Sequence, residues 1–384
     1  MKLDRFLFYL VCFLFVMIMT SLYYPLRYAK YALPLLPLFS ALTNKSKIDK
    51  RIFNYYLTFI VFYGVLIFYL LIQNLLIFDI SARFFPNAVF IITPLLFVLL
   101  LLPYFNPDNI RRYVLVIFYV NICIFLYEEF EGLVKVLTNF NLLADALISS
   151  ELDTESNLAY VFGFLVLFFL FERYKYSKWY LILSSFCFIL CFKRIVIVAV
   201  LLCVIIYFIT SLLKINLSRY RVALTFFGLL VNLFFIQFAY LITSGEFDQY
   251  IFEKTGYNSD RFLMGRKTLY TNAFDTGGAV DLSGLGLGKI DDAMFNFYGV
   301  AFNLHSELIK NYFEFGLLFF IAWLLLLFYK TMFSHKAVII LIYFNVLILT
   351  DNVFIYFDIM FYFYFFILVY LSQNFESQEF SKHE

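Results

Sequence analysis

A histidine, two glutamates and a lysine crowd the start of a long apolar run in the stretch AFNLHSELIKNYFEFGLLFFIAW (301–323). Asn303 is a plausible N-cap, which would place His305 in the first turn of a helix, where the helix dipole disfavours imidazolium. A neutral imidazole can accept a proton from a hydroxyl group, so His305 is a candidate general base. The alternative is an interfacial histidine that only anchors the helix end.

The helical period places the polar residues of this stretch on two faces. At about 100° per residue, Tyr312 follows His305 on one face. A second, polar stripe is made of Glu307, Lys310, Asn311 and Glu314. Such a helix should line a wet cavity on at least one side, and we expect Tyr312 and Glu307 to contact a bound substrate.

Two groups of cations lie at positions that the topology derived below assigns to the outer face. Lys193 and Arg194 stand between two strongly apolar runs, where a charge costs several kcal/mol unless it is paired or faces a polar cavity. Arg261, Arg266 and Lys267 fall within seven residues of each other, and arginine can bind phosphate oxygens through two hydrogen bonds. The alternatives are a short charged turn or snorkelling to lipid headgroups for the first group, and a solvated loop or contact with anionic lipid for the second.

Two further polar segments are weaker candidates. Asp351 and Asn352 stand between two apolar runs and could orient a sugar hydroxyl or pair with an arginine, although helix capping explains them about equally well. The segment DLSGLGLGKI (281–290) is read as a tight turn, because it lacks the spacing of the dinucleotide and P-loop fingerprints. The five cysteines all lie in apolar segments without metal-ligand spacing, and no metal site is expected.

The elements that must position these residues are membrane helices. The chain has 384 residues, of which 64% are hydrophobic, and its mean hydropathy is +0.86. Apolar runs near the ~20 residues that cross a bilayer recur along the whole chain. We predict an all-α, polytopic membrane protein of one domain (1–384) with about twelve transmembrane helices, at 6–23, 28–42, 53–78, 84–103, 112–127, 157–171, 179–192, 195–213, 221–243, 307–329, 337–350 and 353–371.

Basic residues fix the orientation of these spans, because positive loops stay in the cytoplasm. The predicted cytoplasmic segments are 44–51, 109–112, 172–178, 214–221, 329–336 and the C-terminal tail. Both termini are then cytoplasmic, and two long loops, 127–157 and 243–306, face outward. The second of these loops, before the tenth span, contains most of the candidate residues, so any chemistry is expected at the outer face.

In order along the chain, Lys193-Arg194, Arg261 with Gly265-Arg266, GLGLG and HSELIKNYFEFG resemble the O-antigen polymerase and ligase superfamily of polytopic glycosyltransferases. The resemblance implies a metal-independent, inverting transfer without a cofactor at the periplasmic face of a bacterial inner membrane, with undecaprenyl diphosphate as the leaving group. It implies that Arg194 and Arg266 bind the diphosphate, that Arg261 is a second contact, and that His305 activates the acceptor hydroxyl. Lys193, Lys267, Asp351 and Asn352 are further candidate contacts.

Three functions remain open on the sequence. We favour a polymerase, which joins lipid-linked oligosaccharide repeats; a ligase would transfer the glycan to the lipid A core instead. A flippase or transporter would bind the diphosphate only transiently, but its charges would lie in the middle of the spans, and here they gather at the outer boundary. The expected partners are an undecaprenyl-diphosphate-linked oligosaccharide, membrane lipid and, from the resemblance only, a chain-length regulator. No nucleic acid is expected.

Overall fold

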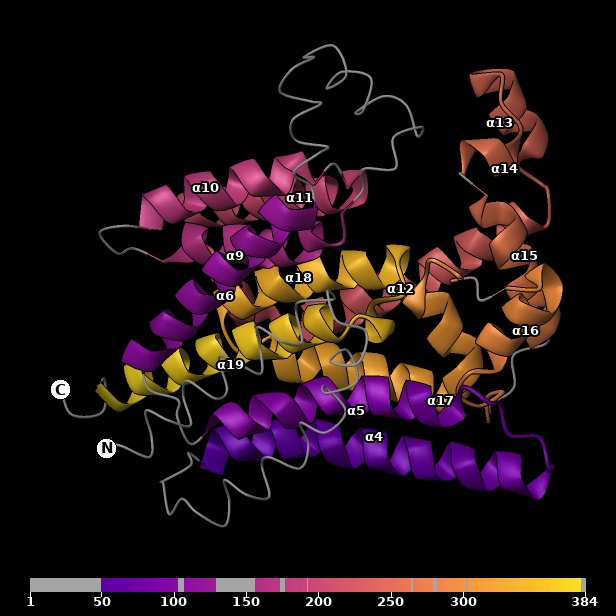
Figure 1. Ribbon diagram of the computed structural model, residues 1–384, viewed down its shortest axis with the longest axis horizontal. Coiled ribbons are helices and arrows are strands. Elements are labelled where there is room, and N and C mark those ends of the chain that lie inside the picture. The colour runs from indigo at the N-terminus through magenta and orange to yellow at the C-terminus, as the bar shows by residue number, and fades with distance from the viewer. Residues whose placement is uncertain are drawn as a thin grey trace.

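The computed structural model describes residues 50–102, 107–128, 156–172, 177–191, 193–263, 265–278, 282–300 and 303–380, and every regular element in these ranges is helical. Ten apolar helices form the body of the protein (Figure 1): α4 (Lys50–Leu76), α5 (Phe84–Leu101), α6 (Pro107–Glu128), α9 (Leu158–Phe171), α10 (Ser177–Leu190), α11 (Arg194–Leu212), α12 (Arg221–Thr243), α17 (Glu307–Thr331), α18 (His335–Thr350) and α19 (Phe357–Phe380). The shorter elements are η3 (Leu217–Tyr220), α13 (Asp248–Thr255), α14 (Ser259–Phe262), α15 (Arg266–Gly277), α16 (Lys289–Tyr298) and η4 (Val353–Ile355).

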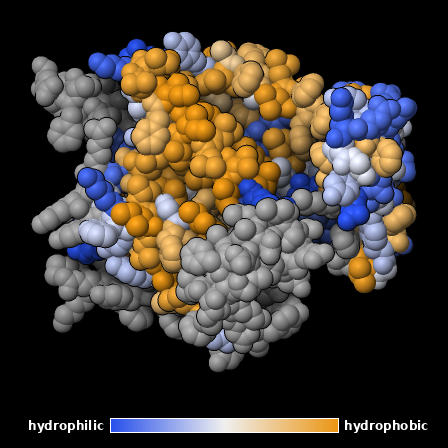
Figure 2. Space-filling view, turned by 90° about the horizontal axis from the view of Figure 1, so that it is seen from above, coloured by the Kyte–Doolittle hydropathy of each residue, from blue (hydrophilic) through white to orange (hydrophobic). Residues whose placement is uncertain are grey.

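Five stretches are long and apolar enough to cross a membrane, which identifies a membrane protein. They are Lys50–Leu76, Ile110–Tyr127, Arg194–Leu212, Leu217–Thr243 and Glu307–Thr331. Figure 2 shows apolar side chains over much of the visible surface, with hydrophilic ones mostly on the right and some on the left. Since lipid tails replace water around such a surface, exposed leucine and phenylalanine side chains on α4, α11 and α12 carry no penalty.

The prediction of an all-helical chain is confirmed in the described residues. The first two predicted spans, 6–23 and 28–42, and most of the loop 127–157 lie outside these residues. Each of the other ten predicted spans corresponds to one of the ten apolar helices, although α9, α10 and α18 have only 14 to 16 residues. The last span was predicted to start at residue 353, but η4 occupies 353–355 and α19 begins at Phe357.

The helices run alternately up and down, as contacts at their ends show. At one end the starts of α9, α11 and α17 meet the end of α18, where Lys193 lies 3.4 Å from Asp351. At the other end the last residues of α9 meet the first of α18, where Lys336 lies 3.3 Å from Glu172. We call the first of these ends the site end.

The centre of the bundle is formed by α9, α18 and α19, whose described side chains are buried on nearly every side. Several hydroxyl and indole groups inside the bundle form hydrogen bonds, since an unsatisfied polar group in an apolar interior is costly. Tyr56 donates to the carbonyl of Tyr364 at 2.7 Å, and the indole N–H of Trp323 donates to the hydroxyl of Tyr63 at 3.0 Å. These bonds fix α4 against α17 and α19.

The segment between α12 and α17 packs as short helices at the site end, on the right of Figure 1. Gly265 adopts a left-handed conformation with φ 79° and separates α14 from α15. Tyr270 and Ala273 of α15 are buried in a small core with Ile309 and Phe313 of α17. This core therefore positions α15 beside the start of α17.

Gly316 kinks α17, with φ 74° and ψ 161°. Because its torsions are not helical, the carbonyls of Phe313 and Glu314 lose the N–H groups that lie four residues ahead in a regular helix. The glycine-rich segment replaces those donors: Leu285 donates to Phe313 O at 2.9 Å and Gly286 donates to Glu314 O at 3.1 Å. The segment is thus a backbone clamp on the kink, and these two N–H groups are used within the protein.

The clamp requires two glycines in direct backbone contact. A Cβ at Gly284, which has φ 79°, would lie 2.6 Å from the carbonyl oxygen of Glu314, inside any allowed contact. Gly256 has a similar φ of 72° but open space around its Cα. We expect Gly256→Ala to lose ~1–2 kcal/mol through backbone strain alone, and Gly284→Ala to lose at least ~2 kcal/mol more, because the backbone must also move. Midpoints of unfolding in mixed detergent micelles check this, and equal midpoints for the two variants would contradict it.

Candidate functional site

The site lies where the chain enters α17 and leaves α18. Ser306 is the N-cap of α17, and its hydroxyl accepts from the N–H of Ile309 at 3.3 Å. The N–H of Ser306 donates to Asn352 Oδ1 at 2.9 Å, and the N–H of Glu307 donates to the carbonyl of Asp351 at 2.9 Å. Asn352 and Ser306 are fully buried. Two segments 46 residues apart in the chain are therefore locked to each other, and the residues beside them are held in place.

The predicted position of His305 in the helix is wrong. The helix begins at Glu307, and its N-cap is Ser306, not Asn303. The Ser306 hydroxyl caps the helix and the Ser306 N–H bonds Asn352, so the helix start is fixed at this residue. His305 precedes the cap in a left-handed conformation with φ 57°. The N-terminal dipole argument for a neutral ring therefore no longer applies. The ring is instead positioned by the hydrogen bonds that join residues 306–307 to 351–352, and it is 41% exposed.

The ring of His305 faces a buried carboxylate. Its Nδ1 lies 3.6 Å from Asp351 Oδ1, slightly beyond hydrogen-bonding distance, while Nε2 is left for other partners. The other carboxylate oxygen of Asp351 accepts from the hydroxyl of Tyr160 and lies 3.4 Å from Lys193 Nζ. Lys193 also donates to Asn157 at 2.9 Å and lies over the ring of Tyr160. Asp351 is also the C-cap residue of α18, as the capping alternative expected, and its carboxylate makes these side-chain contacts in addition.

Burial alone would raise the pKa of Asp351, yet the pKa is lowered. The opposing causes are the His305 ring beside the carboxylate, the charge of Lys193, the hydroxyl of Tyr160 and the N–H of Asn352, which donates at 2.8 Å. All four stabilise the carboxylate form. Asp351 therefore stays ionised and can hold the imidazole of His305 in one tautomer, as a carboxylate does for a general-base histidine.

Asp351 should contribute to stability in a pH-dependent way. A lowered pKa means that the contribution is complete above the unfolded value of about 3.9 and is lost as the pH falls through the folded value. We expect Asp351→Asn to destabilise the protein more at pH 5 than at pH 3. Midpoints of denaturation at the two pH values, with Asp275→Asn on the surface of α15 as the control, test this. A loss of stability that is the same at both pH values would show that the charge of the Asp351 carboxylate does not contribute to stability.

Of the predicted cations, Lys193 contacts Asp351 of the His305–Asp351 pair, and the charge of Arg266 acts on Tyr270 nearby. Arg266 is the first residue of α15, one turn before Tyr270. Tyr270 donates weakly to the carbonyl of His305 at 3.5 Å. Burial raises the pKa of Tyr270 to about 12, and the charges of Arg266 and Asp351 act on it in opposite directions. Arg194, the first residue of α11, is partly buried next to Lys193.

Three predicted contacts lie elsewhere. Arg261 is on α14, where its guanidinium lies 5.0 Å from the ring centre of Tyr257. Lys267 binds Asp248 at 2.6 Å and holds α15 against the start of α13. The ring of Tyr312 packs against that of Phe320 at 5.4 Å inside the bundle. None of the three is joined to the His305–Asp351 pair by a contact that the structure shows, and their proposed roles stay predictions.

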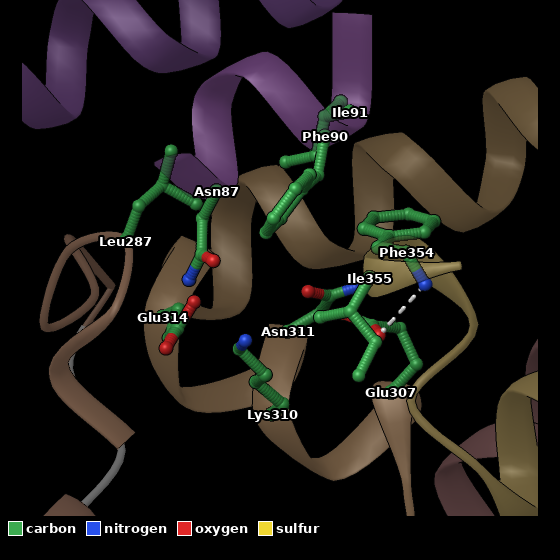
Figure 3. Close-up of a pocket in the computed structure, with 10 residues that line it drawn as sticks. All are labelled: Asn87, Phe90, Ile91, Leu287, Glu307, Lys310, Asn311, Glu314, Phe354 and Ile355. Carbon is green, nitrogen blue, oxygen red and sulfur yellow. Dashed lines mark hydrogen bonds between the residues drawn. The ribbon is translucent and has the colours of Figure 1, made fainter. Parts of the chain in front are cut away.

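The predicted polar stripe of α17 lines one pocket, shown in Figure 3: Glu307, Lys310, Asn311 and Glu314. Lys310 Nζ lies 2.7 Å from Asp291 Oδ2, which also accepts from Asn87 Nδ2 at 2.8 Å. Burial opposes ionisation of Asp291, but Lys310 and Asn87 outweigh it and the pKa is lowered. Glu307 accepts from the N–H of Phe354 at 3.1 Å and lines the pocket.

Sequence reasoning missed Tyr160, Tyr270, Asn87 and Asp291. Tyr160 and Asn87 stand inside apolar runs, and Asp291 stands among several loop carboxylates, so no sequence pattern separates them from ordinary membrane and surface residues. Within the described ranges no cluster of three or more His, Cys, Asp or Glu side chains is placed to hold a metal ion. The side chains around the His305–Asp351 pair are cationic and aromatic.

Comparison with protein-family models, with curated proteins and with solved structures finds no match to this chain. The function therefore has to be inferred from the geometry and chemistry of the site itself.

Proposed function

We propose that the protein is a membrane glycosyltransferase that polymerises diphosphate-linked oligosaccharide repeats at the outer face of a bacterial inner membrane. The observation that supports this most directly is the pairing of His305 with the ionised Asp351 at the site end of the bundle. Proton removal from a sugar hydroxyl needs a partly exposed base held in one tautomer, and this pair supplies it.

The cations beside the pair suit a diphosphate leaving group. Lys193 lies 3.4 Å from Asp351, Arg194 follows it at the start of α11, and Arg266 is close enough to Tyr270 for its charge to act on that hydroxyl. Positive groups fixed before the reaction stabilise the charge that develops on a departing phosphate. The lipid tail of such a substrate would remain in the membrane beside the apolar helices while its headgroup reaches the site.

The distribution of buried charge supports surface chemistry over transport. In the part of the chain that the structure describes, the fully buried charged side chains are Asp291, Glu307, Lys310, Glu314 and Asp351. The three on α17 lie before its kink, within about two turns of the helix start. A transporter would be expected to place charge near the midplane of the membrane, so a flippase is the less favoured function.

Deletion of the protein tests the proposal. Lipopolysaccharide would be displayed on a gel from cells lacking the protein and from the same cells given back the wild type or Arg266→Ala. Core with a single repeat in the deletion and in Arg266→Ala is the expected result. Bare core with lipid-linked polymer accumulating would assign the ligase instead, and an unchanged ladder would contradict both activities.

A further inference from the structure

A small polar cavity lies behind the contact between residues 306–307 and 351–352. It is lined by the polar face of α17, by the start of α5 and by η4 (Figure 3). Its volume is about 10 Å³. A buried water molecule needs about 10–15 Å³ of such space. The cavity therefore has room for one water molecule and for no larger ligand.

One polar group at the wall of this cavity lacks a partner in the protein. Asn311 is 1% exposed, and its Nδ2 atom makes no hydrogen bond to another group in the described part of the chain. The other asparagine at the wall, Asn87, donates to Asp291 at 2.8 Å. Because a buried N–H without an acceptor is costly, such groups usually bond an internal water. Asn311 therefore supplies the donor of a water site.

Glu307 supplies an acceptor on the same face of α17. It stands four residues before Asn311, and side chains at this spacing are neighbours on a helix surface. In Figure 3 the amide of Asn311 lies beside the carboxylate of Glu307, at the lining of the cavity. Glu307 accepts from the N–H of Phe354 at 3.1 Å, and a carboxylate accepts several hydrogen bonds at once. A water between the two side chains can thus bond both.

The chemistry of these groups selects water over an ion. The occupant must accept a hydrogen bond from Asn311 and donate one to Glu307. A metal cation does not accept hydrogen bonds, and the ammonium group of Lys310, which lines the same cavity, disfavours a second positive charge. A halide ion does not donate hydrogen bonds. A water molecule does both.

We propose that one water molecule is bound in this cavity between Asn311 and Glu307. Through the bond from Phe354 to Glu307, the water links the polar face of α17 to η4. This link lies one helical turn from the Ser306–Asn352 bond, so it supports the backbone contact that positions His305. The proposal does not rest on the proposed function, since no glycan takes part.

Radiolytic labelling detects such a water directly. The full-length protein in lipid nanodiscs would be exposed to short X-ray pulses, which split water into hydroxyl radicals, and oxidised phenylalanines would be located by mass spectrometry. A radical reacts close to the water from which it forms, so a buried ring beside a bound water is oxidised. Phe354 lines the cavity and is 4% exposed. Phe357 is the exposure-matched control, because it is 6% exposed and packs against Phe97 instead.

We expect Phe354 to be oxidised at least tenfold faster than Phe357 in the wild type. Asn311→Leu, which has nearly the same size and lacks the donor, should slow the oxidation of Phe354 at least fivefold. Asn232→Leu should leave it within twofold, because Asn232 is a buried asparagine on α12 whose Nδ2 bonds Gly228 in its own helix.

Equal oxidation of Phe354 and Phe357 in the wild type would overturn the proposal, and so would an unchanged rate for Phe354 in folded Asn311→Leu. The comparison of the two rings in the wild type decides the question even if Asn311→Leu does not fold. The result is separable from the proposed activity. Slow oxidation of Phe354 removes the water and leaves the polymerase, whereas fast oxidation with an unchanged glycan ladder on deletion leaves the water and removes the polymerase.

Discussion

Replacement of His305 by alanine is expected to lower the rate of glycan polymerisation by about 10²–10⁴-fold, the usual contribution of a general base. The ring is partly exposed and is held by Asp351, while its backbone is fixed by the Ser306–Asn352 bond. Removing the imidazole should leave this backbone lock intact, because none of its hydrogen bonds uses the side chain. The variant should therefore fold normally but polymerise the glycan more slowly.

The measurement is the initial rate of polymer formation by purified protein in vesicles, from a chemically defined lipid-diphosphate-linked repeat. His335→Ala is the control, because that histidine lies at the opposite end of the bundle, 3.2 Å from Thr210, and should leave the rate within about threefold of wild type. A His305→Ala rate within the same range would contradict the role of His305 as the general base. Binding of the lipid-linked donor should be unchanged in His305→Ala and weakened in Arg266→Ala.

Replacement of Lys310 by methionine is expected to destabilise the protein by about 3–5 kcal/mol, because it leaves buried carboxylates without their counter-charge. Lys310 is 3% exposed and bonds Asp291 at 2.7 Å, while Glu307 and Glu314 lie close enough for their charges to act on it. Methionine has nearly the same length and fills the space, so the loss would come from charge and not from a cavity.

Unfolding in mixed micelles with increasing sodium dodecyl sulfate gives the free-energy change. Lys267→Met is the matched control: Lys267 also binds one aspartate, Asp248, but that carboxylate is 46% exposed. Surface ion pairs of this kind contribute about 0–1 kcal/mol. A loss in Lys310→Met no larger than in Lys267→Met would mean that the carboxylates of the pocket are neutral or solvated without the lysine. Adding Asp291→Asn to Lys310→Met should recover part of the stability, since it removes one of the unpaired charges.

The amino-acid sequence by itself determined that the chain is helical and enters a membrane. Apolar runs of near-bilayer length leave a helix as the only way to satisfy their backbone hydrogen bonds in lipid. The same periodicity placed Glu307, Lys310, Asn311 and Glu314 on one face of α17, where they line one pocket. These are local properties, set by residue type and by the 3.6-residue turn.

Only the tertiary structure decided which residues meet. The start of α17 is set at Ser306 by its bond to Asn352, 46 residues later, so a capping signal at Asn303 could not reveal it. The partner of His305 is Asp351, and the partners of Lys310 are Asp291 and, through it, Asn87, all from other helices or loops. The kink at Gly316 and the glycine clamp on it likewise require two segments 32 residues apart in direct contact. Such pairings depend on how the helices pack, and sequence spacing contains no information on packing between distant segments.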